Sequence, residues 1–173
     1  MSSRKKRRKE RYIYKEKLAM KKGKVFSINY SKTKGTSKIP IKSALLIEGY
    51  GLDKDAHAGS GLRQVSLLSI EGIQKQKECV KIKKPDASLE AGDFAENITT
   101  EGLDLSELEI GDKLKIGCNV ILEISKIGKE CHKYCSIYYK IGDCIMPREG
   151  IFAKVLKGGE IKVGSAIEVA KNV

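Results

Sequence analysis

Apolar residues occur along this chain mostly in short runs, several of which alternate with polar residues as half-buried strands do. Residues 25–29 alternate in this way, and a turn at residues 117–119 joins two further runs into a predicted hairpin. One longer segment, around residues 69–80, predicts a modest helix that ends before Pro85. A turn or a single helical turn is expected at residues 103–108. The predicted strands cover residues 25–29, 43–48, 65–69, 97–101, 113–116, 120–127, 151–156 and 161–169.

The number and length of these elements predict the fold class. Many short strands with one or two helices are typical of a mainly β, barrel-like domain. A length of 173 residues suits one such domain with a real core, and the 17 glycines agree with many turns. We expect the barrel domain at residues 24–173, after a basic tail at residues 1–23.

Positive charge is concentrated at the N-terminus. Of the formal net charge of +12, residues 1–24 carry +10, because they hold twelve Lys or Arg and two acidic residues. A block of like charges with few apolar residues cannot offset its ordering entropy, so we expect it to be disordered or loosely helical. Binding of nucleic acid or an anionic membrane by this tail would depend on salt and not on sequence. No nucleic-acid motif accompanies the charges, which favours a solvated terminus.

The chain contains no apolar stretch long enough to cross a bilayer, and its charged N-terminus lacks the apolar run of a secretory signal. We therefore expect a soluble, cytoplasmic protein. Five cysteines are an odd number, and cytosolic thiols normally stay reduced, so no structural disulfide framework is expected. Cys79 and Cys118 lie in ordinary sequence and are predicted to be small buried hydrophobes.

Cys131 is the candidate chemical centre. It follows the apolar run at residues 120–127, so a strand would hold its thiol rigidly while it faces a ligand. Lys129, His132 and Lys133 beside it favour the thiolate, which is the form that attacks electrophiles and binds metals.

Two other roles involve the neighbouring cysteines. Cys131, His132, Cys135 and Cys144 supply four residue types that bind zinc, but their spacing is poor, because adjacent Cys131 and His132 would have to face one ion. Cys135 is alternatively a resolving thiol that forms a transient disulfide with Cys131, or a structural residue.

Four segments of the chain together resemble the MOSC domain, the C-terminal module of molybdenum-cofactor sulfurases. They occur in family order, cover roughly residues 24–170, and are specific as a set although each is weak alone. The likeness is greatest to the small stand-alone members of the family. The four segments are residues 51–59 with 63–67, residues 92–102, residues 127–132, and residues 143–150 with the turn at 157–159.

This resemblance implies a β-barrel-like fold with few helices and the molybdenum cofactor, or a molybdoenzyme, as partner. It also implies that Cys131 is the family thiol, which carries sulfur or binds molybdenum. The chain has no room for the pyridoxal-phosphate-dependent desulfurase domain of the full sulfurases, so no pyridoxal phosphate site is expected. It is also too short for the extra domains of the amidoxime-reducing relatives, which puts reductase activity in doubt.

His57 and Arg63 are predicted to bind the cofactor. Small residues flank His57, so a backbone there can approach a ligand closely; a structural histidine bonded to a loop carbonyl is the alternative. The planar fork of Arg63 can hold a phosphate or carboxylate in two places, and the cofactor ends in a phosphate. A salt bridge with Asp53 or Asp55 is the alternative for Arg63.

Asn97, Thr99, Thr100 and Arg148 complete the predicted cofactor-binding set. The amide and hydroxyl groups of the first three suit recognition of a heterocycle or phosphate. Thr99 and Thr100 also suit a plain strand. Arg148 would add positive potential near Cys144. Asp93 and Glu96 form a candidate acid/base pair, but a turn cap that faces solvent is the favoured interpretation.

Two functional hypotheses follow. In the first, the protein associates with the molybdenum cofactor, and Cys131 either carries a persulfide, delivering sulfur to the cofactor or to an enzyme, or binds molybdenum directly. Such a protein would be an enzyme of sulfur transfer or of molybdenum-dependent redox chemistry. In the second, it is a non-catalytic binding module that uses the basic tail for nucleic acid or a protein partner.

Overall fold

The computed structural model describes residues 22–81 and 88–170, and within these ranges the predicted mainly β fold is confirmed. Three α-helices are found in this part of the chain: α2 (Ile70–Lys81), α3 (Ser136–Ile141) and α4 (Met146–Glu149). A short 3₁₀ turn, η1, covers Leu105–Glu107. The strands are β1 (Lys22–Tyr30), β2 (Ile39–Ile41), β3 (Ser43–Ile47), β4 (Gly51–Leu52), β5 (Val65–Ser69), β6 (Ile98–Glu101), β7 (Lys113–Ile116), β8 (Val120–Ile127), β9 (Ile151–Lys157), β10 (Gly159–Lys162) and β11 (Ala166–Ala170).

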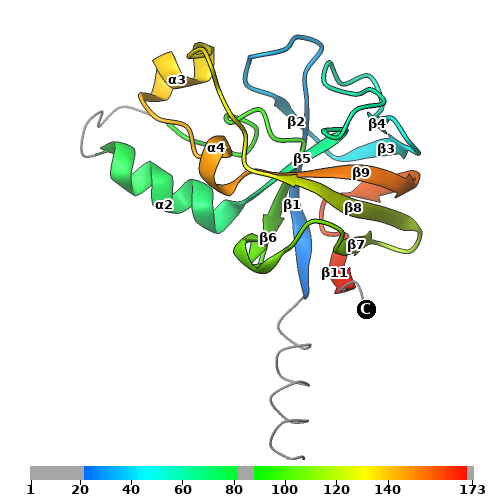
Figure 1. The fold of residues 1–173 in the computed structure, drawn as a ribbon. Coiled ribbons are helices and arrows are strands. Elements are labelled where there is room, and N and C mark those ends of the chain that lie inside the picture. Colours follow the sequence, from blue (N-terminus) through cyan, green and yellow to red (C-terminus); the bar gives the residue numbers. More distant parts are fainter. Residues whose placement is uncertain (1–21, 82–87, 171–173) are drawn as a thin grey trace, which may run out of the picture.

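Seven of these strands form a closed barrel. Its order is β11-β7-β8-β9-β5-β6-β1, and a second pairing between β11 and β1 closes the ring. All neighbours are antiparallel except β5 and β6, which run parallel because α2 crosses between them. A smaller sheet, β10-β3-β4, and the extra strand β2 extend the barrel at one end (Figure 1).

Most predicted elements appear where the pattern placed them, but one predicted strand is in fact two. Residues 161–169 divide at a turn containing Gly164, whose φ of 87° suits glycine. β10 on one side of the turn pairs with β3, whereas β11 on the other pairs with β7 and β1. The short helices α3 and α4 were not predicted.

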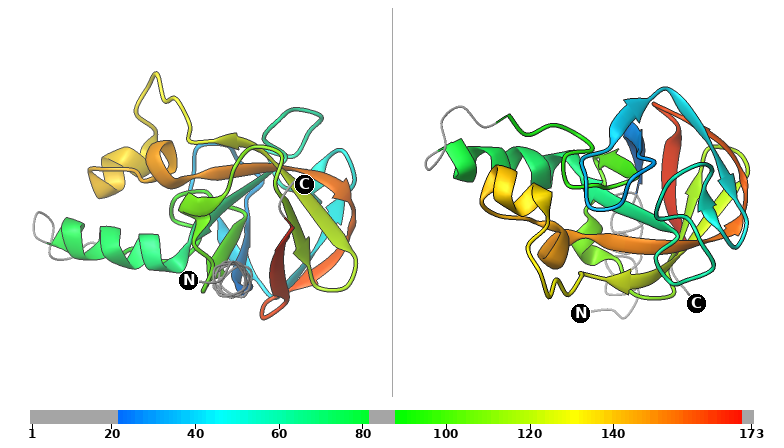
Figure 2. Two further views of the ribbon diagram at one scale, coloured as in Figure 1. Left: turned by 60° about the horizontal axis from the view of Figure 1, so that its bottom comes forward. Right: turned by 90° about the horizontal axis from the view of Figure 1, so that it is seen from above.

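Two apolar cores hold the molecule together. The larger fills the barrel, and its fully buried members include Ile28, Leu67 and Leu122. The smaller lies between the barrel wall and the helices, and it joins Leu68 of β5 and Phe152 of β9 to residues of α2, α3 and α4. All three helices consequently gather on one side of the barrel (Figures 1 and 2). This second core positions the loop that follows β8.

The predicted basic tail lies almost entirely outside the described residues, which begin at Lys22 with β1. Within the described ranges, no helix combines the length and the apolar character that a bilayer crossing requires.

Candidate functional site

Cys131 lies in the loop between β8 and α3, a few residues after the buried strand, as the sequence predicted. Gly128 turns the chain out of the strand with a φ of 70°, and a Cβ there would lie 2.6 Å from the carbonyl oxygen of Pro147. Its N–H donates to the carbonyl of Gly150, 2.7 Å away, so the start of the loop is fastened to the end of α4. The Cys131 side chain itself is exposed.

A cavity of about 110 Å³ lies against this thiol, and we call it the inner cavity. It brings together four residues from separate segments that the sequence analysis singled out: His57, Arg63, Asn97 and Cys131. The other lining residues are Gly35, Ser66, Phe94, Ala95, Lys129, Cys135, Ile137, Cys144, Met146 and Phe152. Tertiary structure therefore assembles much of the predicted set around one small space.

The wall of the inner cavity is cationic and apolar. It includes the basic residues Arg63 and Lys129, and none of the lining residues within the described part of the chain is an aspartate or glutamate. The Arg63 guanidinium lies 5.4 Å from the centre of the Phe152 ring, which is within the range of a cation–π contact. Asp55, a possible partner of Arg63 in the sequence analysis, pairs with Lys38 instead. Such a wall favours an anionic guest inside the cavity.

A second, outer cavity of about 220 Å³ adjoins the first and shares Cys131, Cys135 and Cys144 with it. Arg148 lines this outer cavity, so the predicted positive charge lies near the thiols but not in the inner space. Its guanidinium donates to both carboxylate oxygens of Asp143, at 3.2 and 2.9 Å. This pairing, together with a bond from Gln76, lowers the pKa of Asp143 to about 2, although partial burial opposes the shift.

The three thiols differ in their surroundings. Cys131 is exposed, Cys135 is half-buried and packs against the smaller core, and burial raises the pKa of Cys144. Cys144 therefore stays protonated at neutral pH, and Cys131 is the most accessible thiol at the cavity. The prediction that Cys79 and Cys118 are buried is wrong. Cys79 lies on an exposed side of α2 and Cys118 in the exposed β7–β8 turn.

The amide of Asn97 lines the inner cavity but is already engaged. Its Oδ1 accepts hydrogen bonds from the backbone N–H and the hydroxyl of Ser66, both at 3.1 Å. Its Nδ2 donates to the carbonyl of Asn29 at 3.4 Å. Asn97 thus ties β5 to the start of β6 and to β1, and it shapes the wall of the cavity.

Thr99 and Thr100 line neither cavity. Both are fully buried in β6. The Thr99 hydroxyl donates to Glu96 Oε1 at 2.8 Å, and the Thr100 hydroxyl donates to the carbonyl of Leu68 at 3.5 Å. Both hydroxyls are thus used inside the protein.

Glu96 does not face solvent, contrary to the favoured interpretation of the sequence. Its side chain is fully buried, and burial raises its pKa to about 7 even though the backbone N–H of Gly92 and the Thr99 hydroxyl donate to it. The second oxygen, Oε2, has no hydrogen-bond partner. Asp93 does cap the turn, because its carboxylate accepts from the backbone N–H of Glu90 at 2.9 Å.

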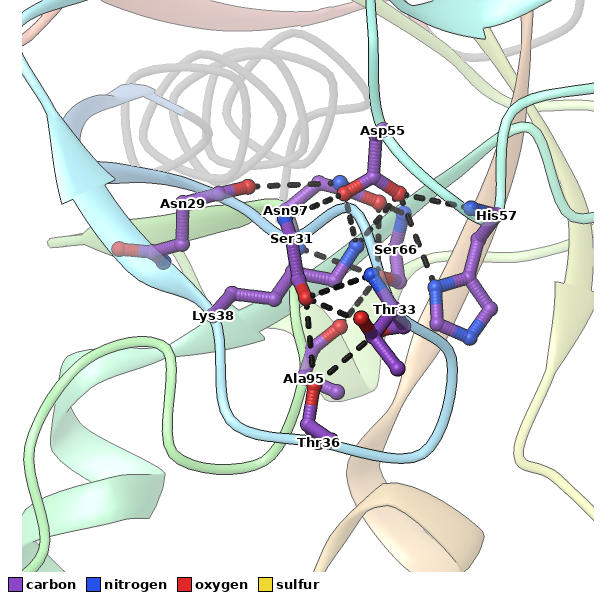
Figure 3. A network of polar contacts seen from close by, with 10 residues as sticks. All are labelled: Asn29, Ser31, Thr33, Thr36, Lys38, Asp55, His57, Ser66, Ala95 and Asn97. Atoms are coloured by element: carbon purple, nitrogen blue, oxygen red, sulfur yellow. Dashed lines mark hydrogen bonds and ion pairs between the residues drawn. The ribbon is translucent and has the colours of Figure 1, made fainter.

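Lys38 and Asp55 form a buried ion pair next to His57, which the sequence analysis did not predict. Lys38 Nζ lies 2.6 Å from each carboxylate oxygen of Asp55, and both side chains are almost fully excluded from solvent (Figure 3). Asp55 also accepts hydrogen bonds from the backbone N–H groups of Ser31 and His57, both at 3.0 Å. Nothing in the sequence around Lys38 distinguishes it from the exposed lysines of the chain.

The zinc interpretation finds no support. In the two described ranges, no group of three or more His, Cys, Asp or Glu side chains is arranged to hold a metal ion, and all four proposed zinc ligands lie in these ranges.

Comparison with known proteins identifies the family. The family model of the MOSC domain matches residues 54–168. The chain belongs to the MOSC domain family. A comparison with curated proteins gave no match.

Solved structures similar to this MOSC domain agree with its fold. The YuaD protein from Bacillus subtilis superposes with a TM-score of 0.69 at 18% identity, over 88% of this chain and 97% of that one. YiiM from Geobacillus stearothermophilus gives 0.64 at 19% identity, over 86% and 75% of the two chains. YiiM from Escherichia coli gives 0.63 at 17% identity, over 87% and 71%.

The match to the MOSC family covers most of the candidate site but not all of it. His57, Arg63, Asn97 and Cys131 lie within residues 54–168, whereas Lys38 lies before them. The buried partner of Asp55 is thus supplied by a segment outside the matched region.

Proposed function

We propose that this MOSC domain acts with the molybdenum cofactor, and that the Cys131 thiol carries sulfur to it or binds its molybdenum. The family is linked to molybdenum-cofactor sulfurase, which supplies the general direction. The observation that carries the proposal is the inner cavity, which Cys131, His57 and Arg63 line together, and whose lining includes no acidic residue among those that the structure describes. Thiols that react as nucleophiles or bind metals typically have cationic neighbours.

The residues present fit the cofactor in their chemistry. Thiolate sulfur is a soft donor, which suits a sulfur atom or a transition metal. The inner cavity, at about 110 Å³, is smaller than the roughly 300–1,000 Å³ of typical ligand pockets. It admits a sulfur atom or the metal end of a cofactor, while the outer cavity extends the space toward Arg148. When bound, the molybdenum would supply redox or sulfur-accepting chemistry.

In this arrangement Cys131 would hold the metal, and Arg63 and Arg148 would attract the anionic parts of the cofactor. Each guanidinium can donate two parallel hydrogen bonds to a phosphate. Arg63 is the stronger candidate, because Arg148 is already paired with Asp143.

The sulfur-carrying version requires a donor persulfide. The Cys131 thiolate would attack the outer sulfur of the donor, the donor's S–S bond would break, and the donor thiolate would leave. Cys131 would then hold the transferred sulfur as a persulfide, without any net change of oxidation state.

Substitution of single cysteines tests this function. Purified Cys131→Ala protein should lose both persulfide formation with a small-molecule persulfide donor and retention of molybdenum and pterin on co-purification. Cys79→Ala is the matched control, since Cys79 is also exposed but lies in α2, away from both cavities. Mass spectrometry of the intact protein measures the first property, and metal and pterin analysis the second.

Equal losses in the two variants, or none in either, would refute the assignment of Cys131. The alternative hypothesis, a binding module that acts through its basic tail, predicts instead that removal of residues 1–22 abolishes binding while Cys131 stays unreactive. The tail lies almost entirely outside the described residues, and the alternative stays a prediction.

A further inference from the structure

Three tyrosines gather at the surface beside the outer cavity, and we call Tyr134, Tyr138 and Tyr139 the tyrosine cluster. The rings of Tyr134 and Tyr138 are stacked, with centroids 3.8 Å apart and planes 13° from parallel. The Tyr139 ring meets both of them edge-on, with centroids 6.2 and 6.3 Å away. Tyr134 is 64% exposed and Tyr139 is 71% exposed, so most of their aromatic surface faces solvent. Exposed clusters of large apolar groups are typical of binding sites.

The segment that carries the tyrosine cluster is fixed to the protein from below. Ile137 of α3 is buried in the smaller core, and Cys135 packs against the same core. The N–H of Gly142 donates to the carbonyl of Tyr138 at 2.6 Å and ends α3 in a left-handed conformation, with a φ of 84°. The backbone under the rings is therefore held in place. Tyrosine rings on a fixed backbone offer a large contact area to a ligand at a low cost in conformational entropy.

Two members of the cluster, Tyr134 and Tyr138, line the outer cavity of about 220 Å³. Pro147 and Arg148 of α4 line the same cavity, so two separate elements bound it (Figure 1). The volume is below the roughly 300–1,000 Å³ of pockets that enclose a drug-sized ligand. The outer cavity therefore suits one ring system of a larger ligand. The rest of that ligand can extend toward the inner cavity, because Cys131 lines both spaces.

The outer cavity also offers positive charge. Lys133 and Arg148 line it, and Asp143 is the one acidic residue among the lining residues that the structure describes. Arg148 donates to both carboxylate oxygens of Asp143. The backbone N–H of Cys144 and the amide of Gln76 donate to the same carboxylate. A carboxylate has about four acceptor sites, so these bonds occupy Asp143 fully. The guanidinium uses only two of its five N–H groups in this pair, and it can therefore also donate to an anion.

We propose that the tyrosine cluster and Arg148 form a stacking site for a flat heteroaromatic ring that carries an anionic substituent. In the proposed function, on which this inference rests, that ring is the pterin of the molybdenum cofactor. The ring stacks on the pair of Tyr134 and Tyr138, and Arg148 attracts the anionic group. Tyr139 supports the pair through its edge contacts. The site would hold the ligand beside Cys131 through contacts that do not involve the thiol.

Isothermal titration calorimetry of the full-length protein with pterin-6-carboxylate, a flat anionic probe, tests the stacking. Tyr134→Leu keeps an apolar side chain but removes the aromatic face, so it should weaken binding roughly 5- to 100-fold, as expected for loss of one stacking partner. Tyr134→Phe keeps the ring and should bind as tightly as wild type. Tyr50→Leu is the matched control and should leave binding unchanged, because Tyr50 is also exposed, at 45%, but lines neither cavity.

A second variant tests the anionic part of the ligand. Arg148→Met should weaken binding of pterin-6-carboxylate about tenfold, the order of effect expected for loss of a charged hydrogen bond, and should leave binding of uncharged pterin nearly unchanged. Inorganic phosphate at the same concentration should displace little of the bound probe, since phosphate has no ring to stack. Complete displacement by phosphate would mean that charge alone holds the probe, and would overturn the inference.

Equal affinities of wild type and Tyr134→Leu for pterin-6-carboxylate would overturn it as well. Tighter binding of adenosine monophosphate than of pterin-6-carboxylate would assign the site to nucleotides and contradict the pterin assignment. A dimer in analytical ultracentrifugation that Tyr134→Leu abolishes, with no binding of the probe, would show that the cluster pairs with a second copy of the chain instead.

Failure of this inference and failure of the proposed function give different results. If the probe does not bind while Cys131 still forms a persulfide or retains molybdenum, only the stacking site is wrong. If Cys131→Ala loses neither property, the assigned thiol is wrong, yet the titrations still decide whether the tyrosine cluster binds a pterin.

Discussion

Replacing the buried Glu96 by glutamine should remove a large part of the pH dependence of stability. In the folded protein the pKa of Glu96 is raised by burial to about 7, compared with an ordinary value of 4.5. Below pH 4.5 the carboxyl group is protonated in both the folded and the unfolded protein. Between these two values the unfolded chain loses the proton while the folded protein keeps it, so the free energy of unfolding falls as the pH rises.

The size of this effect follows from the two pKa values. Each pKa unit corresponds to about 1.4 kcal/mol, so the free energy of unfolding should fall by roughly 3 kcal/mol as the pH rises from 4.5 to above 7. Glutamine carries no charge at any of these pH values and has the same shape. Its Oε1 can keep the bonds from Gly92 and Thr99. Its amide nitrogen would take the place of the unpartnered Oε2 and costs about 1–3 kcal/mol at every pH, which leaves the slope unaffected.

Urea unfolding followed by far-UV circular dichroism at several pH values measures the effect, since the chain has no tryptophan for fluorescence. The free energy of wild type minus that of Glu96→Gln should decrease by about 3 kcal/mol between pH 4.5 and a pH above 7. Glu48→Gln, at an exposed glutamate, is the matched control and should follow wild type closely. Parallel curves for wild type and Glu96→Gln would refute the reasoning that burial of the carboxyl group controls its proton affinity.

Two further substitutions compare a buried ion pair with an exposed one. Lys38→Met should lower the free energy of unfolding, measured with urea, by about 3–5 kcal/mol, because it leaves the Asp55 carboxylate buried without its cation. A loss of stability no larger than that caused by breaking an exposed ion pair would contradict this. Arg148→Met should lower the free energy of unfolding by less than about 1 kcal/mol in the same assay, since the Arg148 and Asp143 side chains are both about half exposed. A larger loss of stability would mean that Arg148 has a structural role in the outer cavity.

Local patterns were sufficient for the fold class because strand alternation and turn residues act over a few neighbouring positions. β5, β7 and β8 begin and end where the apolar runs do, and α2 matches the predicted helix to within a residue. The pattern predicted one strand at residues 161–169, but this apolar run forms parts of two strands. Of these, β10 pairs with β3 and β11 pairs with β7. The partner of a strand depends on the path of the whole chain, which a local pattern does not contain.

Charged residues were the main source of error in the site. Lysine and glutamate are rarely buried, so Lys38 drew no attention and Glu96 was expected in solvent. The Asp55 carboxylate, which pairs with the buried Lys38 ammonium group, is 17 positions away in the sequence. The partners of Asn97 and Thr99 on β1 are about 70 positions away. These polar groups become buried and hydrogen-bonded only when β1, β5 and β6 pack together.

The amino-acid sequence by itself determined the mainly β architecture and the MOSC family, and it singled out Cys131, His57 and Arg63 as candidate site residues. These depend on short-range periodicity and on motifs read along the chain. Only the tertiary structure decided that the three share one small cavity, that Asn97 and the two threonines are occupied inside the protein, and that Asp55 and Lys38 lie beneath His57. Distances between segments, and the loss of water around charged groups, exist only in the folded chain.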